Sequence, residues 1–491
     1  MPVGEEFTQR EGTEEEPRVH GELASRLAVA KVAADPSHSK GGNIDRFARL
    51  AALKPVRVVP ARPAELRAPD ETDSLSRLLG AGIARNHYGE HLAIRNWFST
   101  PEFAEPSRIA LELLTKRPAS EGGRSKKQIQ NGQRALEDPE KWLFLDTETT
   151  GLAGGTGTYA FLVGLAWWDA GGLQVEQLFL RDFSEEHSLL HELASRLAER
   201  PVLVTFNGKT FDWPLLENRF TMTRAIKVPE LAAHLDLLHP ARALWKLRLG
   251  SVRLMELERH VLDAERLGWH RGDDVSSALI PQFYFEYLRG GTADPLAGVV
   301  KHNQMDLRGL AALFGKINSL LDERQSLVAE DSLDLFGLSK FLQRRGDNER
   351  AHSTCVKALD AGLPAEFRPR ATRDLALMAK RRGDGDSAAA LWHELAGDPA
   401  DGIEACEQLA IHYEHRARDF EHALEFAQLA LAKLQRQRAP SCDPYARERT
   451  QRLEEKLMCR VERLRHRIDR SNAAVQAPLL AKRAGAGGNF R

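Results

Sequence analysis

Apolar and polar positions follow two different patterns along this chain. Between residues 141 and 320, strand-like apolar runs such as WLFLD, TYAFLVGLAWWD, LQVEQLFLRDF and PVLVTF precede or alternate with segments of helical leucine spacing such as SLLHELASRLAER. Strands that come first in hairpins and then alternate with helices are typical of a mixed sheet flanked by helices. We therefore predict an α/β domain over residues 138–322.

Residues 328–470 show no strand pattern and carry a repeat instead. The segments RRGDNERAHSTCVKAL, RRGDGDSAAALWHEL and RARDFEHALEFAQLAL align on Ala351, Ala388 and Ala423, with spacings of 37 and 35 residues. An apolar helical segment precedes each copy. A helix, a turn and a second helix at intervals of about 34 residues is the tetratricopeptide plan. We predict an all-α repeat domain of this kind that binds a protein partner, with a generic helical bundle as the alternative fold.

The remaining segments are less regular. Residues 1–74 are poor in aromatics and rich in Glu, Arg, Ala and Pro, which predicts a mostly disordered region. Residues 75–137 are interpreted as a small ordered lead-in segment followed by a flexible linker. Residues 471–491 are interpreted as a basic, flexible tail.

Composition narrows the class of protein. The chain has 491 residues, which is too long for one core, and a net charge of −1, so any site for a polyanion must be a local basic patch. Its 4 cysteines form no CxxC pair, which disfavours a disulfide framework and a zinc site. The acidic start lacks the apolar core of a signal peptide, and no run is long enough to span a membrane. We expect a cytoplasmic protein with no membrane partner.

Two acids end the first apolar run of the α/β domain. Asp146 and Glu148 are two residues apart on a strand, so they project from the same face. Burying two like charges is costly unless something neutralises them, and a divalent cation suits carboxylate oxygens. Both acids could instead cap the next turn or face solvent.

Further acids follow at two places. Asp212, in VLVTFNGKTFDWPLL, stands where a helix begins after a buried strand, a position that also complements a helix dipole. His302 and Asp306 are four apart on a predicted helix and share a face, as a plain structural pair also would. Each feature has an ordinary structural interpretation when taken alone.

In this order, DxE, NGxxFD and HxxxD resemble the DnaQ-like (DEDD) exonuclease superfamily of the ribonuclease H-like fold. DTETTGLAGGTGTYAFLVGLAWW, TFNGKTFDWPLLENRF, HLDLLHPARALWKLRLGSVRLMELERHVL and DDVSSALIPQFYFEYLRGG are more narrowly similar to bacterial YprB-type ribonuclease H-like proteins, over about residues 140–320. A tetratricopeptide-like tail fits the same group.

The resemblance implies a hydrolase, a metal-dependent 3′–5′ exonuclease that uses two Mg²⁺ or Mn²⁺ ions. Their ligands would be Asp146, Glu148, Asp212 and Asp306, and His302 would accept the proton of the attacking water. His302 has the spacing to Asp306 that tyrosine-type members show.

We expect nucleic acid, DNA or RNA with a single-stranded 3′ end, to contact residues beside the acids and in the basic stretch RALWKLRLGSVR: Thr149, Asn207, Lys209, Phe211, Arg242, Lys246 and Arg248. Trp245 lies within that stretch, a pattern typical of a single-strand path and equally of a partly solvated helix. Asp236 is either a supporting carboxylate or a surface acid. Gly154, Gly155 and Gly157 are expected in a loop beside the acids.

Two other functions remain open. The chain could be an inactive nuclease-like scaffold that binds a protein partner through its repeats, or a structure-specific endonuclease on the same fold. Fold alone does not separate these activities.

Overall fold

The computed structural model describes residues 69–99, 108–115, 135–151, 156–169, 171–265, 271–272, 274–322, 324, 327, 330–398, 402–437 and 444–485. Of the region expected to be disordered, residues 1–74, only the last six are described, and they belong to the helix α3 (Pro69–Leu79). Gly154 and Gly155 lie outside the described residues.

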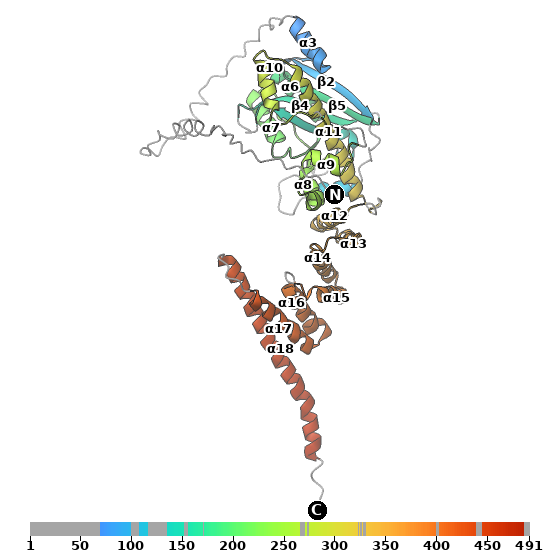
Figure 1. Ribbon diagram of the computed structural model, residues 1–491, viewed down its shortest axis with the longest axis vertical. Coiled ribbons are helices and arrows are strands. Elements are labelled where there is room, and N and C mark those ends of the chain that lie inside the picture. Colours follow the sequence, from blue (N-terminus) through green and yellow to red (C-terminus); the bar gives the residue numbers. More distant parts are fainter. Residues whose placement is uncertain are drawn as a thin grey trace, which may run out of the picture. The chain divides into compact units, whose positions relative to one another are not determined.

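A seven-stranded mixed sheet forms the centre of the α/β part (Figure 1). Its strands are β1 (Gly82–Asn86), β2 (Gly89–Ser99), β3 (Trp142–Thr149), β4 (Ala160–Asp169), β5 (Gly172–Phe179), β6 (Val202–Thr205) and β7 (Ala233–Asp236). The spatial order is β1-β2-β5-β4-β3-β6-β7. β3 pairs parallel with β6, and β6 with β7, whereas the other pairs are antiparallel. This confirms the predicted ribonuclease H-like mixed sheet.

Helices cover both faces of the sheet. They are α4 (Arg108–Thr115), α6 (Glu186–Glu199), α7 (Asp212–Thr223), α8 (Leu238–Leu249), α9 (Leu254–His260), α10 (Ile280–Leu288) and α11 (Asp294–Leu321), with short 3₁₀ turns at Pro139–Lys141 and Phe183–Glu185. Trp142 and Phe144 pack in one cluster with α8 and α11, and Leu143 and Leu145 in a second cluster with α6 and α7. Full burial of each such side chain contributes about 2–3 kcal/mol. The apolar run WLFLD is continuous because both of its faces are covered.

The sequence interpretation missed β1 and β2, which it treated as an ordered lead-in. They form a hairpin that continues the sheet beyond β5, with Leu92 opposite Phe179. Gly89 follows the hairpin turn with φ 128°, a conformation that favours glycine. The alternation of buried and exposed residues on β2 is interrupted by a buried histidine, His91, and this hid the strand pattern.

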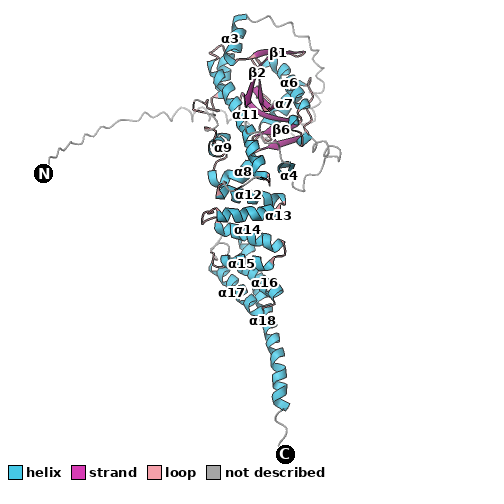
Figure 2. Ribbon diagram, turned by 90° about the vertical axis from the view of Figure 1, so that its right-hand side faces the viewer, coloured by secondary structure: helices cyan, strands magenta, loops and turns pink. Residues whose placement is uncertain are grey.

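From residue 332 onward, every described element is a helix (Figure 2). The helices are α12 (Ser332–Arg345), α13 (Asn348–Asp360), α14 (Arg368–Arg381), α15 (Gly385–Leu395), α16 (Gly402–His412), α17 (Phe420–Arg436) and α18 (Pro444–Gly485), with a π-helical turn at Tyr413–Ala417 after α16. α12 packs with α13, α14 with α15, and α16 with α17. The helical region is thus confirmed, whereas its tetratricopeptide type stays a prediction.

The repeat has a local physical cause in the helix starts. The aspartates Asp347, Asp384 and Asp419 each stand four residues before an aligned alanine and accept a hydrogen bond from the backbone N–H three residues later, as helix N-caps. Such a cap stabilises a helix by about 1 kcal/mol. The alanines Ala351, Ala388 and Ala423 are buried, which lets the paired helices approach closely.

The helical region is joined to the α/β part by a shared core. Leu335 and Phe336 of α12 belong to the same apolar cluster as Trp142. Gly337 packs so closely on α8 that an added Cβ would overlap the carbonyl oxygen of Leu244. Apolar side chains therefore remain in contact across the expected domain boundary near residue 328.

The end of the described chain differs from the sequence interpretation. α18 continues through residues 471–485, where we expected a flexible tail. Among the described helices, none combines the length and apolar character needed to cross a membrane.

Candidate active site

The candidate site lies where two parallel strands separate. β3 and β6 pair only as far as Phe144 and Val204, and β3 then continues to Thr149 with β4 alone beside it. Asp146 and Glu148 follow the last position paired with β6. Ligands commonly bind at the carboxyl ends of strands in such sheets, so these acids stand on a rigid strand at a suitable edge.

The third acid, Asp212, is placed by the turn after β6. Its Oδ1 accepts a hydrogen bond from Thr147 Oγ1 at 2.6 Å. Asp236, buried at the end of β7, accepts the backbone N–H groups of Asn207 at 2.8 Å and Lys209 at 3.1 Å. Asp236 is thus a supporting carboxylate that fixes the turn into α7, and it is not a surface acid.

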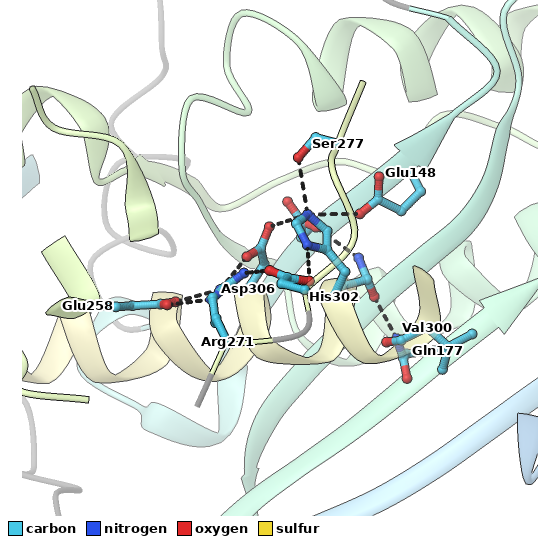
Figure 3. A network of polar contacts seen from close by, with 11 residues as sticks. Glu148, Gln177, Glu258, Arg271, Ser277, Val300, His302 and Asp306 are labelled. Atoms are coloured by element: carbon cyan, nitrogen blue, oxygen red, sulfur yellow. Dashed lines mark hydrogen bonds and ion pairs between the residues drawn. The ribbon is translucent and has the colours of Figure 1, made fainter. Parts of the chain in front are cut away.

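The helix α11 brings His302 and Asp306 to the acids of β3 (Figure 3). Nε2 of His302 lies 4.0 Å from a carboxylate oxygen of Glu148 and 3.6 Å from one of Asp306. Nδ1 of the same ring lies 2.8 Å from Oδ1 of Asp274. His302 is buried, so its ring is held among these three carboxylates.

One guanidinium links three carboxylates beside the site. Arg271 donates hydrogen bonds to Asp306 at 2.5 Å, to Glu258 on α9 at 2.6 Å and to Asp274 at 2.9 Å. Glu258 reaches it across Gly309 of α11, where an added Cβ would overlap the carboxylate. The positive charge of Arg271 therefore fixes one oxygen of Asp306 from the side.

Asp146 also has a dedicated partner. Nδ2 of Asn303, the residue after His302, donates to Oδ2 of Asp146 at 2.8 Å. Asn303 is fully buried, and its own oxygen accepts from Gln177 of β5 at 2.8 Å. The first acid is therefore held by a side chain of α11.

The electrostatics show an excess of negative charge. Burial raises the pKa of Asp146 well above its ordinary value, and the charges on Asp306, Glu148 and Asp212 raise it further. Burial and neighbouring carboxylates raise the pKa of Glu148 in the same way, and burial raises that of Asp212. Because burial and the neighbouring negative charges both disfavour the ionised carboxylates, a bound cation would stabilise the ionised forms.

The chemistry of these side chains fits a divalent cation. Carboxylate oxygens are the ligands that Mg²⁺ and Mn²⁺ prefer. Within the described residues, however, no three or more His, Cys, Asp or Glu side chains are arranged to hold a metal ion as they stand. Arg271 and Asn303 instead engage one oxygen of Asp306 and one of Asp146, and binding would use the remaining oxygens.

The structure separates the expected nucleic-acid contacts into two groups. Lys209, Phe211, Arg242 and Lys246 are exposed, Asn207 is half-buried, and half-buried Thr149 donates to the carbonyl of Gly151. Arg248 instead forms an ion pair at 2.7 Å with Asp334 of α12, and Trp245 is fully buried in the core. Trp245 is therefore not available to stack on a base.

Sequence reasoning missed four residues around the site: Gln177, Arg271, Asp274 and Asn303. Asn303 carried a usable signal, since it stands beside His302 as an amide on the apolar side of a helix. Gln177 is a polar residue within a buried strand, which also called for a partner. Arg271 and Asp274 lie in a segment without periodicity.

Sequence similarity to known proteins includes the part of the chain that carries the candidate site. Residues 143–318 match the RNase_H_2 family, described as RNase_H superfamily. A Bacillus subtilis (strain 168) protein named "Uncharacterized protein YprB" is 32% identical over 295 residues, which cover 59% of this chain and 68% of that protein. The match extends over more residues than the family region alone.

Proposed function

Since this chain belongs to the same family as the Bacillus YprB protein and carries an RNase_H superfamily domain at residues 143–318, we propose that it is a metal-dependent nuclease. It hydrolyses phosphodiester bonds of DNA or RNA and acts as a 3′–5′ exonuclease with two Mg²⁺ or Mn²⁺ ions. The observation that carries the proposal is the grouping of carboxylates around the end of β3. His302 lies 4.0 Å from Glu148 and 3.6 Å from Asp306, Asn303 donates to Asp146, and Thr147 of β3 donates to Asp212.

The four acids would hold the ions, with Asp146 and Asp306 offering the oxygens that Asn303 and Arg271 leave unbound. Bound divalent ions supply two effects, a lower pKa of the attacking water and stabilisation of charge on the leaving oxygen. The rigid placement of Asp146 and Glu148 on β3 and the burial of His302 favour a fixed geometry for the reacting phosphate.

His302 acts as the proton acceptor in this proposal. An ionised carboxylate can only accept a hydrogen bond, so Asp274 fixes the proton of the neutral ring on Nδ1. Burial alone would raise the pKa of Asp274, but hydrogen bonds from His302 and Arg271 lower it, which keeps it ionised. Nε2 is then an acceptor that faces Glu148 and Asp306.

Exposed side chains beside the acids would bind the strand. Phe211 precedes Asp212 and is 56% exposed, and Lys209 is exposed in the same turn. An exposed ring stacks on a base, and a basic side chain contacts phosphate. Arg242 and Lys246 on α8 extend this contact, and the helical region would bind a protein partner.

The test uses the purified full-length chain with Mn²⁺ or Mg²⁺ and 5′-end-labelled single- and double-stranded DNA and RNA. We expect a ladder of products shortened from the 3′ end and no cleavage of circular single strands. Asp146→Asn should abolish activity, whereas Asp169→Asn, the same change at an exposed position of β4, should not. Cleavage of circles would favour an endonuclease, and no metal-dependent cleavage would favour the scaffold alternative.

A further inference from the structure

A row of three residues crosses the sheet at the candidate site. Asp146 on β3 pairs with Gly164 on β4, and Gly164 pairs with Gln177 on β5, so their side-chain positions share one face. Gly164 leaves space between the other two. The amide of Asn303, from α11, fills that space, since an added Cβ at Gly164 would overlap Asn303 Oδ1.

The hydrogen bonds along this row have a fixed direction. Nε2 of Gln177 donates to the carbonyl oxygen of Val300 at 2.8 Å and to Oδ1 of Asn303 at 2.8 Å (Figure 3). A backbone carbonyl only accepts, so Val300 determines which end of the Gln177 amide points at α11. Asn303 must then present its oxygen to Gln177 and its NH₂ group to Asp146.

This direction is maintained at a cost. Both bonds use the same nitrogen of Gln177, and its Oε1 has no hydrogen-bond partner among the described residues. A buried polar atom without a partner destabilises the fold by about 1–3 kcal/mol. If the row served only to satisfy buried polar groups, an apolar residue at position 177 would serve the fold as well.

We propose that Asn303 is a positioning residue that fixes the carboxylate of Asp146. Gln177, on β5, in turn determines which end of the Asn303 amide faces Asp146. Neither side chain is a metal ligand in this account. Asn303 holds Oδ2 of Asp146 and leaves the other oxygen for a cation. The inference rests on the proposed function in one respect, that Asp146 binds the metal.

The test is Gln177→Glu, in a residue that makes no contact with Asp146 in the hydrogen-bond network. An ionised glutamate cannot donate to Val300, and it would turn the Asn303 amide so that its oxygen faces Asp146. The matched control is Gln174→Glu, on the same strand, where the amide nitrogen also donates two hydrogen bonds, here to the backbone carbonyls of Asn96 and Val175.

The readout is the affinity of the full-length protein for Mn²⁺, measured by calorimetry without substrate. We expect Gln177→Glu to weaken binding about 10- to 100-fold, as loss of outer partners does in other metal sites, and Gln174→Glu to change it less than about 2-fold. An added negative charge alone would strengthen cation binding, so weakening reports the lost orientation. Unchanged Mn²⁺ affinity in a folded Gln177→Glu protein overturns the proposal.

Gln177→Met covers the case in which the glutamate variant does not fold. It removes both donated bonds without adding charge, so Asn303 is free to turn and Mn²⁺ affinity should fall several-fold. Parent-like affinity in the methionine variant also overturns the proposal.

Asp146→Asn distinguishes this inference from the proposed function. If Asp146→Asn abolishes Mn²⁺ binding while both Gln177 variants bind Mn²⁺ normally, the positioning role of Gln177 and Asn303 is excluded and the nuclease proposal stands. If Asp146→Asn leaves Mn²⁺ binding unchanged, Asp146 is not a metal ligand, and the positioning role is then tested by hydrogen exchange of the Asn303 side-chain NH₂ group in ¹⁵N-asparagine-labelled protein. Slow exchange in the parent that becomes fast in Gln177→Met supports the positioning role. Equal exchange rates in the two proteins overturn it.

Discussion

Nδ1 of His302 lies 2.8 Å from Oδ1 of Asp274, and the other ring nitrogen lies 3.4 Å from Ser277 Oγ. His302 lies on α11 and Asp274 in the loop before α10, and both side chains are largely buried. A carboxylate that holds one nitrogen of a histidine leaves the other as a directed proton acceptor.

Asp274→Asn should therefore slow cleavage. An amide can donate or accept, so it no longer fixes the ring proton on Nδ1, and we expect kcat to fall about 10- to 100-fold. Mn²⁺ affinity should change little, because the hydrogen bonds of Asp274 go to His302 and Arg271 and not to any of the four proposed ligands. Single-turnover cleavage rates and Mn²⁺ calorimetry measure the two effects separately.

His302→Ala provides the comparison. If both residues act as one unit, the double variant should be no slower than His302→Ala alone. Near-parent rates for His302→Ala would remove the proton-acceptor role from the proposal and leave the four acids as its basis. Asp169→Asn serves again as the exposed control.

Sequence patterns predicted the main part of the fold for a physical reason. β3, β4 and β6 are buried on both faces, so their apolar runs are continuous, and α11 has a long apolar stripe. The motifs also placed Asp146, Glu148, Asp212, His302 and Asp306 in one region. Strand periodicity and helix spacing report burial, which is a local property of these segments.

Contacts between distant segments were not predictable in this way. Trp245 and Arg248 read as parts of a basic surface, but α12 covers them, with Asp334 neutralising Arg248 at 2.7 Å. Arg271 reaches Asp306, and Gln177 reaches Asn303, only because the topology brings those segments together. Local spacing carries no record of such pairs.

Acid should destabilise the protein through His91. Burial lowers the pKa of His91 from 6.5 to about 4, outweighing the opposing effect of Glu176. Above pH 6.5 the ring is neutral in both states, but between pH 6.5 and 4 the unfolded chain binds a proton that the folded protein does not. The free energy of unfolding therefore decreases as the pH is lowered from 6.5 to 4. His91 accounts for up to about 3 kcal/mol of this decrease.

His91→Leu should make that fall shallower, as urea unfolding at a series of pH values would show. The slope should not vanish, since burial also lowers the pKa of His234 to about 4. His239→Gln, at an exposed position of α8, should leave it unchanged. A parent-like pH dependence in His91→Leu would contradict the assignment.

Arg242 and Lys246 of α8 should affect nucleic-acid binding, whereas Arg248 of the same helix should affect stability. Arg242→Ala and Lys246→Ala remove exposed charges, so each should weaken nucleic-acid binding at every sequence and reduce the salt slope by about 1. Arg248→Ala should instead leave Asp334 buried without its partner and lower the free energy of unfolding by about 2–4 kcal/mol. Filter binding at several salt concentrations and urea unfolding distinguish the two effects. An unchanged salt slope in both Arg242→Ala and Lys246→Ala would exclude α8 from the strand path.

The ion pair between Arg271 and Glu258 should be stabilising only as a pair. Glu258 is 3% exposed, and burial raises its pKa to about 7 although Arg271 lowers it. Arg271→Met leaves a buried carboxylate with no guanidinium, so we expect the free energy of unfolding to fall by about 3–5 kcal/mol at pH 8. Glu258→Met combined with Arg271→Met should recover a large part of that loss, because no charge then remains buried across Gly309.

Urea unfolding of the parent, the two single variants and the double variant forms a complete cycle. The expected result is a coupling of about 1–3 kcal/mol, with the double variant more stable than Arg271→Met. Cleavage should still be lost in the double variant, because Asp306 has also lost its guanidinium partner. Additive losses in the cycle would mean that Arg271 acts mainly through Asp306 and Asp274, and full activity in the double variant would remove Arg271 from the site.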